Sequence, residues 1–208
     1  MNYTKLSKED AVRFYARLAL NTSKYDNIPE VCISRAYLTT SRVLHGMGVY
    51  TDTQKIVIKN RAAAIILHFV NNISFREMEE AEFDNAHAEV CGLLLEYYGQ
   101  LNPAVHFTIG TAQKWINMTL KHMIMFHLIE INEWRATLQF LNNYKHFHIP
   151  IDSYIKDNEN IRGIYLEKFD DIAWSNIDDY AAYIELQNQL RTEYGPLLDF
   201  EFDVWMKA

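Results

Sequence analysis

The segment from Thr111 to Ile129 restricts the fold of this chain more than any other stretch of the sequence. It reads TAQKWINMTLKHMIMFHLI, and its apolar side chains would occur on nearly all sides of a helix. A helix that is apolar all round belongs in the interior of a protein. The segment therefore predicts a central helix, with the rest of the chain packed around it.

The composition favours helices for the remainder of the chain as well. Only 7 glycines and 4 prolines interrupt the 208 residues, and 49% of the residues are hydrophobic. Such a chain has few helix breakers and enough apolar side chains for one core. We predict a single all-α domain over residues 1–208, in which two helical lobes could flank a cleft. Start signals for further helices occur at Ser7, Ile28, Asp52, Ser74 and Ser175.

Several features indicate a cytoplasmic protein without a membrane segment. The first residues, MNYTKLSKED, are charged and do not resemble a signal peptide. The longest uninterrupted apolar run, Ala62 to Leu67, is far too short to cross a bilayer. The two cysteines, Cys32 and Cys91, have no spacing typical of a disulfide framework or a metal site. We interpret this pattern as typical of a reducing compartment.

Neither a metal nor an organic cofactor is expected. The sequence contains no glycine-rich phosphate loop and no H-E-x-x-H motif. His122 and His127 are five residues apart, a spacing that does not place both on one helix face. A run of carboxylates is interpreted as a solvated helix face rather than a metal site; it comprises Glu77, Glu79, Glu80, Glu82 and Asp84.

Two lysines interrupt the apolar central segment. Lys114 and Lys121 are two helical turns apart and therefore share a face. With Thr111 as the N-cap, Lys114 would lie in the first turn, where burial and the helix dipole both favour the neutral amine. A neutral lysine amine is a nucleophile that can form a Schiff base. The alternative is that both lysines extend past an apolar stem to reach water.

Three blocks of sequence resemble one enzyme family. The first is Gln113-Lys114 followed by Thr119 and Lys121, after the turn Thr108-Ile109-Gly110-Thr111. The second is the Phe147-His148-Ile149-Pro150-Ile151-Asp152 segment, and the third is Tyr194-Gly195-Pro196-Leu197 with Glu201 and Trp205. In this order the blocks resemble archaeal-type 8-oxoguanine DNA glycosylases, members of the helix-hairpin-helix superfamily. The turn has one glycine, where the family's hairpin has two that let backbone amides approach a phosphate.

The resemblance implies a role for each matched residue. Lys114 corresponds to the nucleophilic lysine, Asp152 to the essential aspartate and Lys121 to a second lysine near the active site. Glu201 and Trp205 correspond to the carboxylate and tryptophan that hold the extruded base. From the residues alone, other roles stay open: Asp152 could cap a helix, Trp205 could belong to the core and Glu201 could be exposed.

Three functions follow as hypotheses. The first is a DNA N-glycosylase with lyase activity that removes an oxidised purine, 8-oxoguanine, through a lysine Schiff base. The second keeps the fold but acts on a free nucleoside or nucleotide, and the third is a non-catalytic protein that binds such a ligand. The formal net charge of −7 argues against a broad DNA-binding surface. It does not exclude a local basic patch that binds DNA with a damaged base.

Overall fold

Helix α5, Ile109–Ile129, is the central helix that the sequence predicts. Most of its residues are buried, and it packs most extensively against α2, Ile28–Thr40. The indole N–H of Trp115 donates to the carbonyl oxygen of Ile33 in α2 (2.9 Å), and its ring lies 4.8 Å from that of Tyr37. A side chain as large as tryptophan can be buried here because its polar atom finds a partner.

The computed structural model describes residues 12, 27–130 and 133–206. The helix expected from Ser7 lies outside these residues, apart from Val12. Every regular element in the described ranges is helical, which confirms the all-α prediction. Besides α2 and α5, the α-helices are α3 (Asp52–Phe75), α4 (Glu80–Gly99), α6 (Leu138–Asn142), α7 (Ser153–Lys156), α8 (Arg162–Phe169), α9 (Tyr180–Tyr194) and α10 (Leu197–Met206). Short 3-10 helices include η2 (Ser41–Val43), η3 (Met47–Val49), η5 (Asn143–His146) and η6 (Trp174–Asn176).

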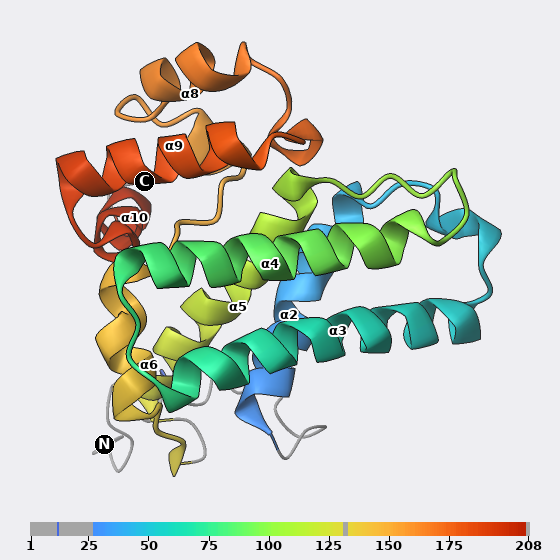
Figure 1. Ribbon diagram of the computed structural model, residues 1–208, viewed down its shortest axis with the longest axis horizontal. Coiled ribbons are helices and arrows are strands. Elements are labelled where there is room, and N and C mark those ends of the chain that lie inside the picture. The colour runs from blue at the N-terminus through green and yellow to red at the C-terminus, as the bar shows by residue number, and fades with distance from the viewer. Residues whose placement is uncertain (1–11, 13–26, 131–132, 207–208) are drawn as a thin grey trace, which may run out of the picture.

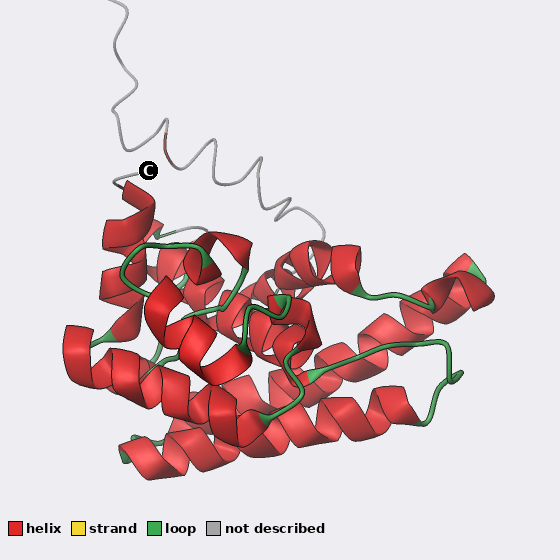
Figure 2. Ribbon diagram, turned by 90° about the horizontal axis from the view of Figure 1, so that it is seen from above, coloured by secondary structure: helices red, strands yellow, loops and turns green. Residues whose placement is uncertain are grey.

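The long helices α3 and α4 run antiparallel and side by side, with α2 and α5 packed behind them (Figure 1). Helices α8, α9 and α10 gather beside them (Figure 1), and loops and turns connect the helices (Figure 2). The buried apolar side chains form one continuous cluster from Ile28 to Val204. Within the described residues, no helix combines the length and the apolar character needed to cross a membrane.

The N-cap of α5 is Thr108, so the prediction of Thr111 was wrong. Thr108 is extended, and its hydroxyl oxygen accepts the backbone N–H of Thr111 (3.1 Å). The same hydroxyl donates to the carbonyl of Ser175 (2.6 Å), a tertiary contact that the local sequence does not reveal. Lys114 is therefore the sixth helical residue. The dipole acts mainly within the first turn, so its effect on this amine is weaker than the sequence argument assumed.

Two other predicted helix starts were also wrong, because other residues nearby in the sequence cap these helices. Ser74 lies inside α3, where its hydroxyl donates to the carbonyl of Val70 (2.7 Å), and Glu79 caps α4 instead. Ser175 lies in η6, and α9 begins at Tyr180 after Asp179, whose carboxylate accepts two helix N–H groups. Helix α9 ends at Tyr194 and is followed by Gly195 at φ +76°, a conformation that favours glycine.

Gly110 fixes the distance between α5 and η6. Its backbone N–H donates to the carbonyl of Ile177 (2.8 Å), and a Cβ at this position would overlap the carbonyl oxygen of Trp174. The close approach of η6 to the first turn of α5 therefore requires a residue without a side chain.

We expect Gly110→Ala to destabilise the fold by about 3 kcal/mol, because the obstacle is backbone and cannot rotate away. The urea midpoint of unfolding measures the effect. Gly92→Ala, at an exposed position of α4, is the control, because nothing lies within 4 Å of the added Cβ. This control should stabilise by up to about 1 kcal/mol through helix propensity. Equal midpoints for both variants would contradict the packing argument.

Candidate functional site

The lysines of α5 each contact a carboxylate from the C-terminal part of the chain. Nζ of Lys114 forms an ion pair with Oδ2 of Asp152. Two turns along the same face, Nζ of Lys121 lies 2.7 Å from Oε1 of Glu201 in α10. Their side chains are only 7% and 13% exposed, respectively. The lysines therefore do not extend into water, and the four predicted charged residues come together as two ion pairs.

Asp152 fills both of the roles that the sequence left open. Its Oδ1 caps α7 by accepting the backbone N–H of Ile155 (2.9 Å), while its Oδ2 faces Lys114. A cap fixes the orientation of the carboxylate, because one oxygen is tied to the backbone. The second oxygen is thereby directed at the amine, and the carboxylate remains 19% exposed.

Glu201 is the most deeply buried member of the site. Its side chain is 1% exposed, and Oε2 has no hydrogen-bond partner among the described residues. Burial raises the pKa of the Glu201 carboxyl, while the charges of Lys121 and Lys114 oppose that rise. Because Lys114 and Asp152 both influence this carboxyl, the two ion pairs belong to one electrostatic cluster. An unpaired buried acceptor is costly unless a ligand donor can satisfy it.

Aromatic rings surround the two amines. Nζ of Lys114 lies 5.8 Å from the ring centre of Trp174, and Nζ of Lys121 lies 5.1 Å from Phe202 and 5.4 Å from Trp205. These distances are typical of cation–π contacts. Neither Trp174 nor Phe202 has a local sequence motif that reveals its position beside a lysine.

Trp205 belongs to the edge of the site rather than to the core. It is 46% exposed and stacks on Tyr154, with ring centres 4.1 Å apart and planes 26° apart. Tyr154 in turn donates its hydroxyl hydrogen to the carbonyl of Val204 (3.2 Å). The two rings form a partly exposed aromatic pair next to Lys121, and Tyr154 was not predicted.

The segment 147–151 carries Asp152 to Lys114 in an extended conformation, as Pro150 predicts. Its backbone is bonded to glutamine side chains instead of a neighbouring strand. Gln113 of α5 bonds to both the N–H (3.1 Å) and the carbonyl (2.9 Å) of Ile151. Gln187 of α9 does the same for Ile149, at 3.1 Å for each bond. These amides satisfy a buried backbone that could not otherwise be accommodated.

A second buried polar cluster lies behind this segment. His148 donates from Nε2 to Asp84 (2.9 Å) and bonds through Nδ1 to the hydroxyl of Tyr183 (3.0 Å). Arg191 pairs with the same carboxylate (3.1 Å), and Asn117 links Tyr183 to His87. Asp84 is therefore not part of a solvated face, contrary to prediction, because α9 and His148 cover it.

The turn before α5 differs from an open hairpin. The N–H of Gly110 is bonded to Ile177 and that of Thr111 to Thr108. Amides with partners inside the chain are not free to bind a phosphate. In the described ranges, no three histidine, cysteine or carboxylate side chains come together in a way that could hold a metal ion.

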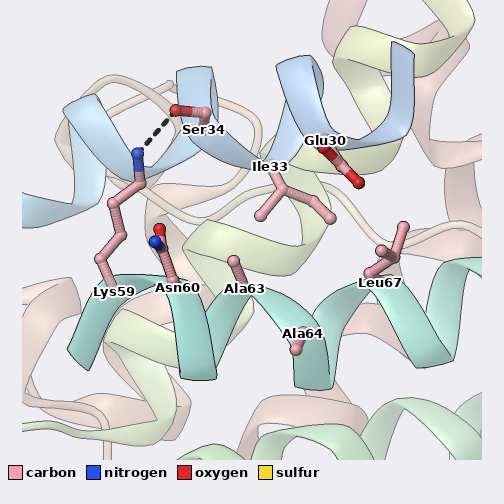
Figure 3. Close-up of a pocket in the computed structure, with 8 residues that line it drawn as sticks. All are labelled: Glu30, Ile33, Ser34, Lys59, Asn60, Ala63, Ala64 and Leu67. Carbon is pink, nitrogen blue, oxygen red and sulfur yellow. Dashed lines mark hydrogen bonds between the residues drawn. The ribbon is translucent and has the colours of Figure 1, made fainter. Parts of the chain in front are cut away.

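A hollow of about 330 Å³ lies between α2 and α3 (Figure 3), and none of its lining residues belongs to the two lysine–carboxylate pairs. Lys59 donates across it to the hydroxyl of Ser34 (2.7 Å). Its other lining residues are Glu30, Ile33, Asn60, Ala63, Ala64 and Leu67. Glu30 lies at the opposite end of the hollow from Lys59, so the two do not form a pair like that of Lys114 and Asp152.

The buried histidines make stability dependent on pH. Burial lowers the pKa of His87 and His148 below the ordinary 6.5, and lowers that of His122 to about 4. The unfolded chain then binds more protons below pH 6.5, so stability should fall as the pH drops from 7.5 to 5. Each histidine contributes up to about 1.4 kcal/mol per pH unit.

Urea unfolding across this range measures the slope. We expect His87→Gln to flatten it, whereas His68→Gln, at an exposed position of α3, should leave it unchanged. An unchanged slope in His87→Gln would contradict the assignment of a neutral buried imidazole.

No protein-family model matches the sequence, no curated protein is similar to it, and no solved structure matches it. The two ion pairs and the residues that position them are therefore the features that indicate a function for this chain.

Proposed function

We propose that this protein is a DNA N-glycosylase with lyase activity, built on a fold like that of the helix-hairpin-helix glycosylases. Its proposed substrate is an oxidised purine, 8-oxoguanine, in DNA, and its proposed nucleophile is Lys114. The observation that carries the proposal is the buried contact between Lys114 and Asp152. A nucleophile next to a carboxylate that can both take a proton and stabilise positive charge is what glycosidic bond cleavage by an amine requires.

The proposed reaction begins with an extruded nucleotide whose C1′ faces Lys114. A proton passes from the ammonium of Lys114 to Asp152, and the free amine attacks C1′. The bond from C1′ to the base nitrogen breaks, and the base leaves with that bonding pair and takes the proton from Asp152, whose carboxylate is thereby regenerated. Positive charge on the sugar in the transition state is stabilised by nearby negative charge. The adduct opens to a Schiff base, from which β-elimination breaks the strand.

The second ion pair supports a role in holding the base. Oε2 of Glu201 is a buried acceptor without a partner, suited to an N–H group of a purine. Lys121 offers N–H donors to a purine carbonyl oxygen. The ring of Trp205 is partly exposed and could stack on the base, a contact worth about 1–3 kcal/mol.

Access to the amine requires movement of its cover. The Lys114 side chain is 7% exposed and lies beneath Trp174. A nucleotide can reach Nζ only if this ring, or the η6 segment that carries it, shifts. We therefore expect substrate binding to alter the environment of Trp174.

A second candidate is an enzyme or binding protein for a free nucleoside or nucleotide. One observation favours it: the N–H of Gly110, which an open hairpin would offer to a DNA phosphate, is bonded to Ile177. The net charge of −7 is also easier to reconcile with a small ligand than with a duplex.

Borohydride trapping tests the leading proposal. Wild-type protein should form a covalent adduct with an 8-oxoguanine or abasic duplex. In Lys114→Gln the yield of adduct should fall by at least about a thousandfold, because this variant lacks the amine that contacts Asp152. Lys59→Gln, which removes a lysine from the hollow between α2 and α3, is the matched control and should react normally. A normal adduct in Lys114→Gln would rule out this nucleophile. No adduct from wild type, together with thermal stabilisation by nucleosides, would favour the second candidate.

A second assay should distinguish the role of the base-holding pair, Lys121 and Glu201, from that of the nucleophile. We expect Glu201→Gln to lose about 10–100-fold in 8-oxoguanine excision, as for loss of a charged hydrogen bond. The same variant should still be trapped on an abasic duplex, which has no base to hold. Circular dichroism melting would confirm that the variant is folded. Equal losses on both substrates would contradict a role specific to the base.

A further inference from the structure

The side chain of Gln113 connects the two partners of the proposed catalytic pair. Its Nε2 donates to the carbonyls of Ile151 (2.9 Å) and Gly110 (3.0 Å). Its Oε1 accepts the N–H of Ile151 (3.1 Å) and a side-chain N–H of Asn117 (3.1 Å). Both N–H groups and both oxygen lone pairs of the Gln113 amide therefore have a hydrogen-bond partner, and the residue is fully buried.

Both residues joined by this link, Gln113 and Ile151, are sequence neighbours of the proposed catalytic pair. Gln113 directly precedes Lys114, and Ile151 directly precedes Asp152. Fixing the Ile151 backbone to α5 thus fixes the Cα of Asp152 relative to the lysine that it contacts. Misplacement of a catalytic group by about 1 Å can cost on the order of a hundredfold in rate.

Asn117 holds the orientation of the link. Three acceptors lie within hydrogen-bonding distance of the two N–H groups of its Nδ2: Oε1 of Gln113, the carbonyl oxygen of Ile149 (3.2 Å) and the hydroxyl of Tyr183 (2.9 Å). Its Oδ1 faces His87 (3.0 Å). A rotation of the Gln113 amide would place N–H against N–H at Ile151 and at Asn117. The arrangement is therefore satisfied in one orientation only.

We propose that Gln113 is a positioning residue that holds the Asp152 carboxylate against the amine of Lys114. This inference rests on the proposed function for its catalytic meaning, but its geometric content is independent of the substrate. Gln113 touches neither reacting group, and its effect is transmitted through the backbone of Ile151.

The chain contains a matched control for this role. Gln187 makes the same two backbone bonds to Ile149, but from α9 and without a link to the helix that carries Lys114. Gln187→Ala removes similar buried hydrogen bonds from the same segment. A purely structural role predicts the same result for both glutamines, whereas a positioning role predicts different ones.

The test is the pH titration of Lys114, followed by NMR of ¹³C-lysine-labelled full-length protein and assigned with Lys114→Arg. Asp152→Asn should move the titration midpoint. Gln113→Ala should move it in the same direction and to most of that extent, and Gln187→Ala should leave it in place. Gln113→Met keeps a similar side-chain volume without a charge or these hydrogen bonds, and it serves as a second variant should the alanine variant not fold.

Trapping on an abasic duplex is run beside the titration. Gln113→Ala should slow it about tenfold or more relative to Gln187→Ala. An unmoved midpoint in the folded Gln113 variants, equal shifts in both glutamine variants, or no shift in Asp152→Asn would overturn the positioning role. A shifted midpoint in a protein whose wild type traps no DNA would uphold that role while refuting the proposed function.

Discussion

Two lysine ammonium groups on the buried helix α5 must be neutralised, and this requirement constrains how the second half of the chain is arranged. Uncompensated charges at Lys114 and Lys121 would be too costly to bury, so a carboxylate has to reach each of them. Asp152 arrives at the end of an extended segment and Glu201 from the last helix. The route of the chain from α6 to α10 is compatible with both contacts at once.

The same arrangement gives the two pairs different characters. At Asp152 one oxygen is committed to a helix cap and the carboxylate stays partly exposed, while the amine that it contacts is covered. At Glu201 the carboxylate is buried and one oxygen has no hydrogen-bond partner among the described residues. In the proposed enzyme, the first pair would react with the sugar and the second would hold the base.

Helical periodicity and local backbone rules predicted much of this structure. The apolar circumference of residues 111–129 identified the central helix, and the seven-residue spacing placed Lys114 and Lys121 on one face. The residue before Pro150 is kept out of the α region, and residues 147–152 accordingly contain no helix. In contrast, the meeting of Lys121 with Glu201 was suggested only through resemblance, because 80 residues separate them and no local pattern encodes the contact.

The wrong predictions have two physical origins. Thr111, Ser74 and Ser175 are all good capping residues, but Thr108, Glu79 and Asp179 compete with them locally and cap the helices instead. Asp84 was assigned to solvent because its neighbours are acidic, but α9 and His148 enclose it. The role of Gln113 was missed for the same reason, since a glutamine in a helix gives no sign of the backbone it will meet.

The manner in which residues 147–151 are held has a consequence for how this protein tolerates change. In a β-sheet, pairing depends on main-chain groups that every residue type except proline supplies, so a single substitution seldom breaks the pairing of a strand. Here the corresponding bonds come from two glutamine side chains on separate helices. A substitution at either glutamine would therefore release one end of the segment from its helix without disturbing the helices. These two uncharged positions should accordingly tolerate as little sequence change as the ion pairs that they position.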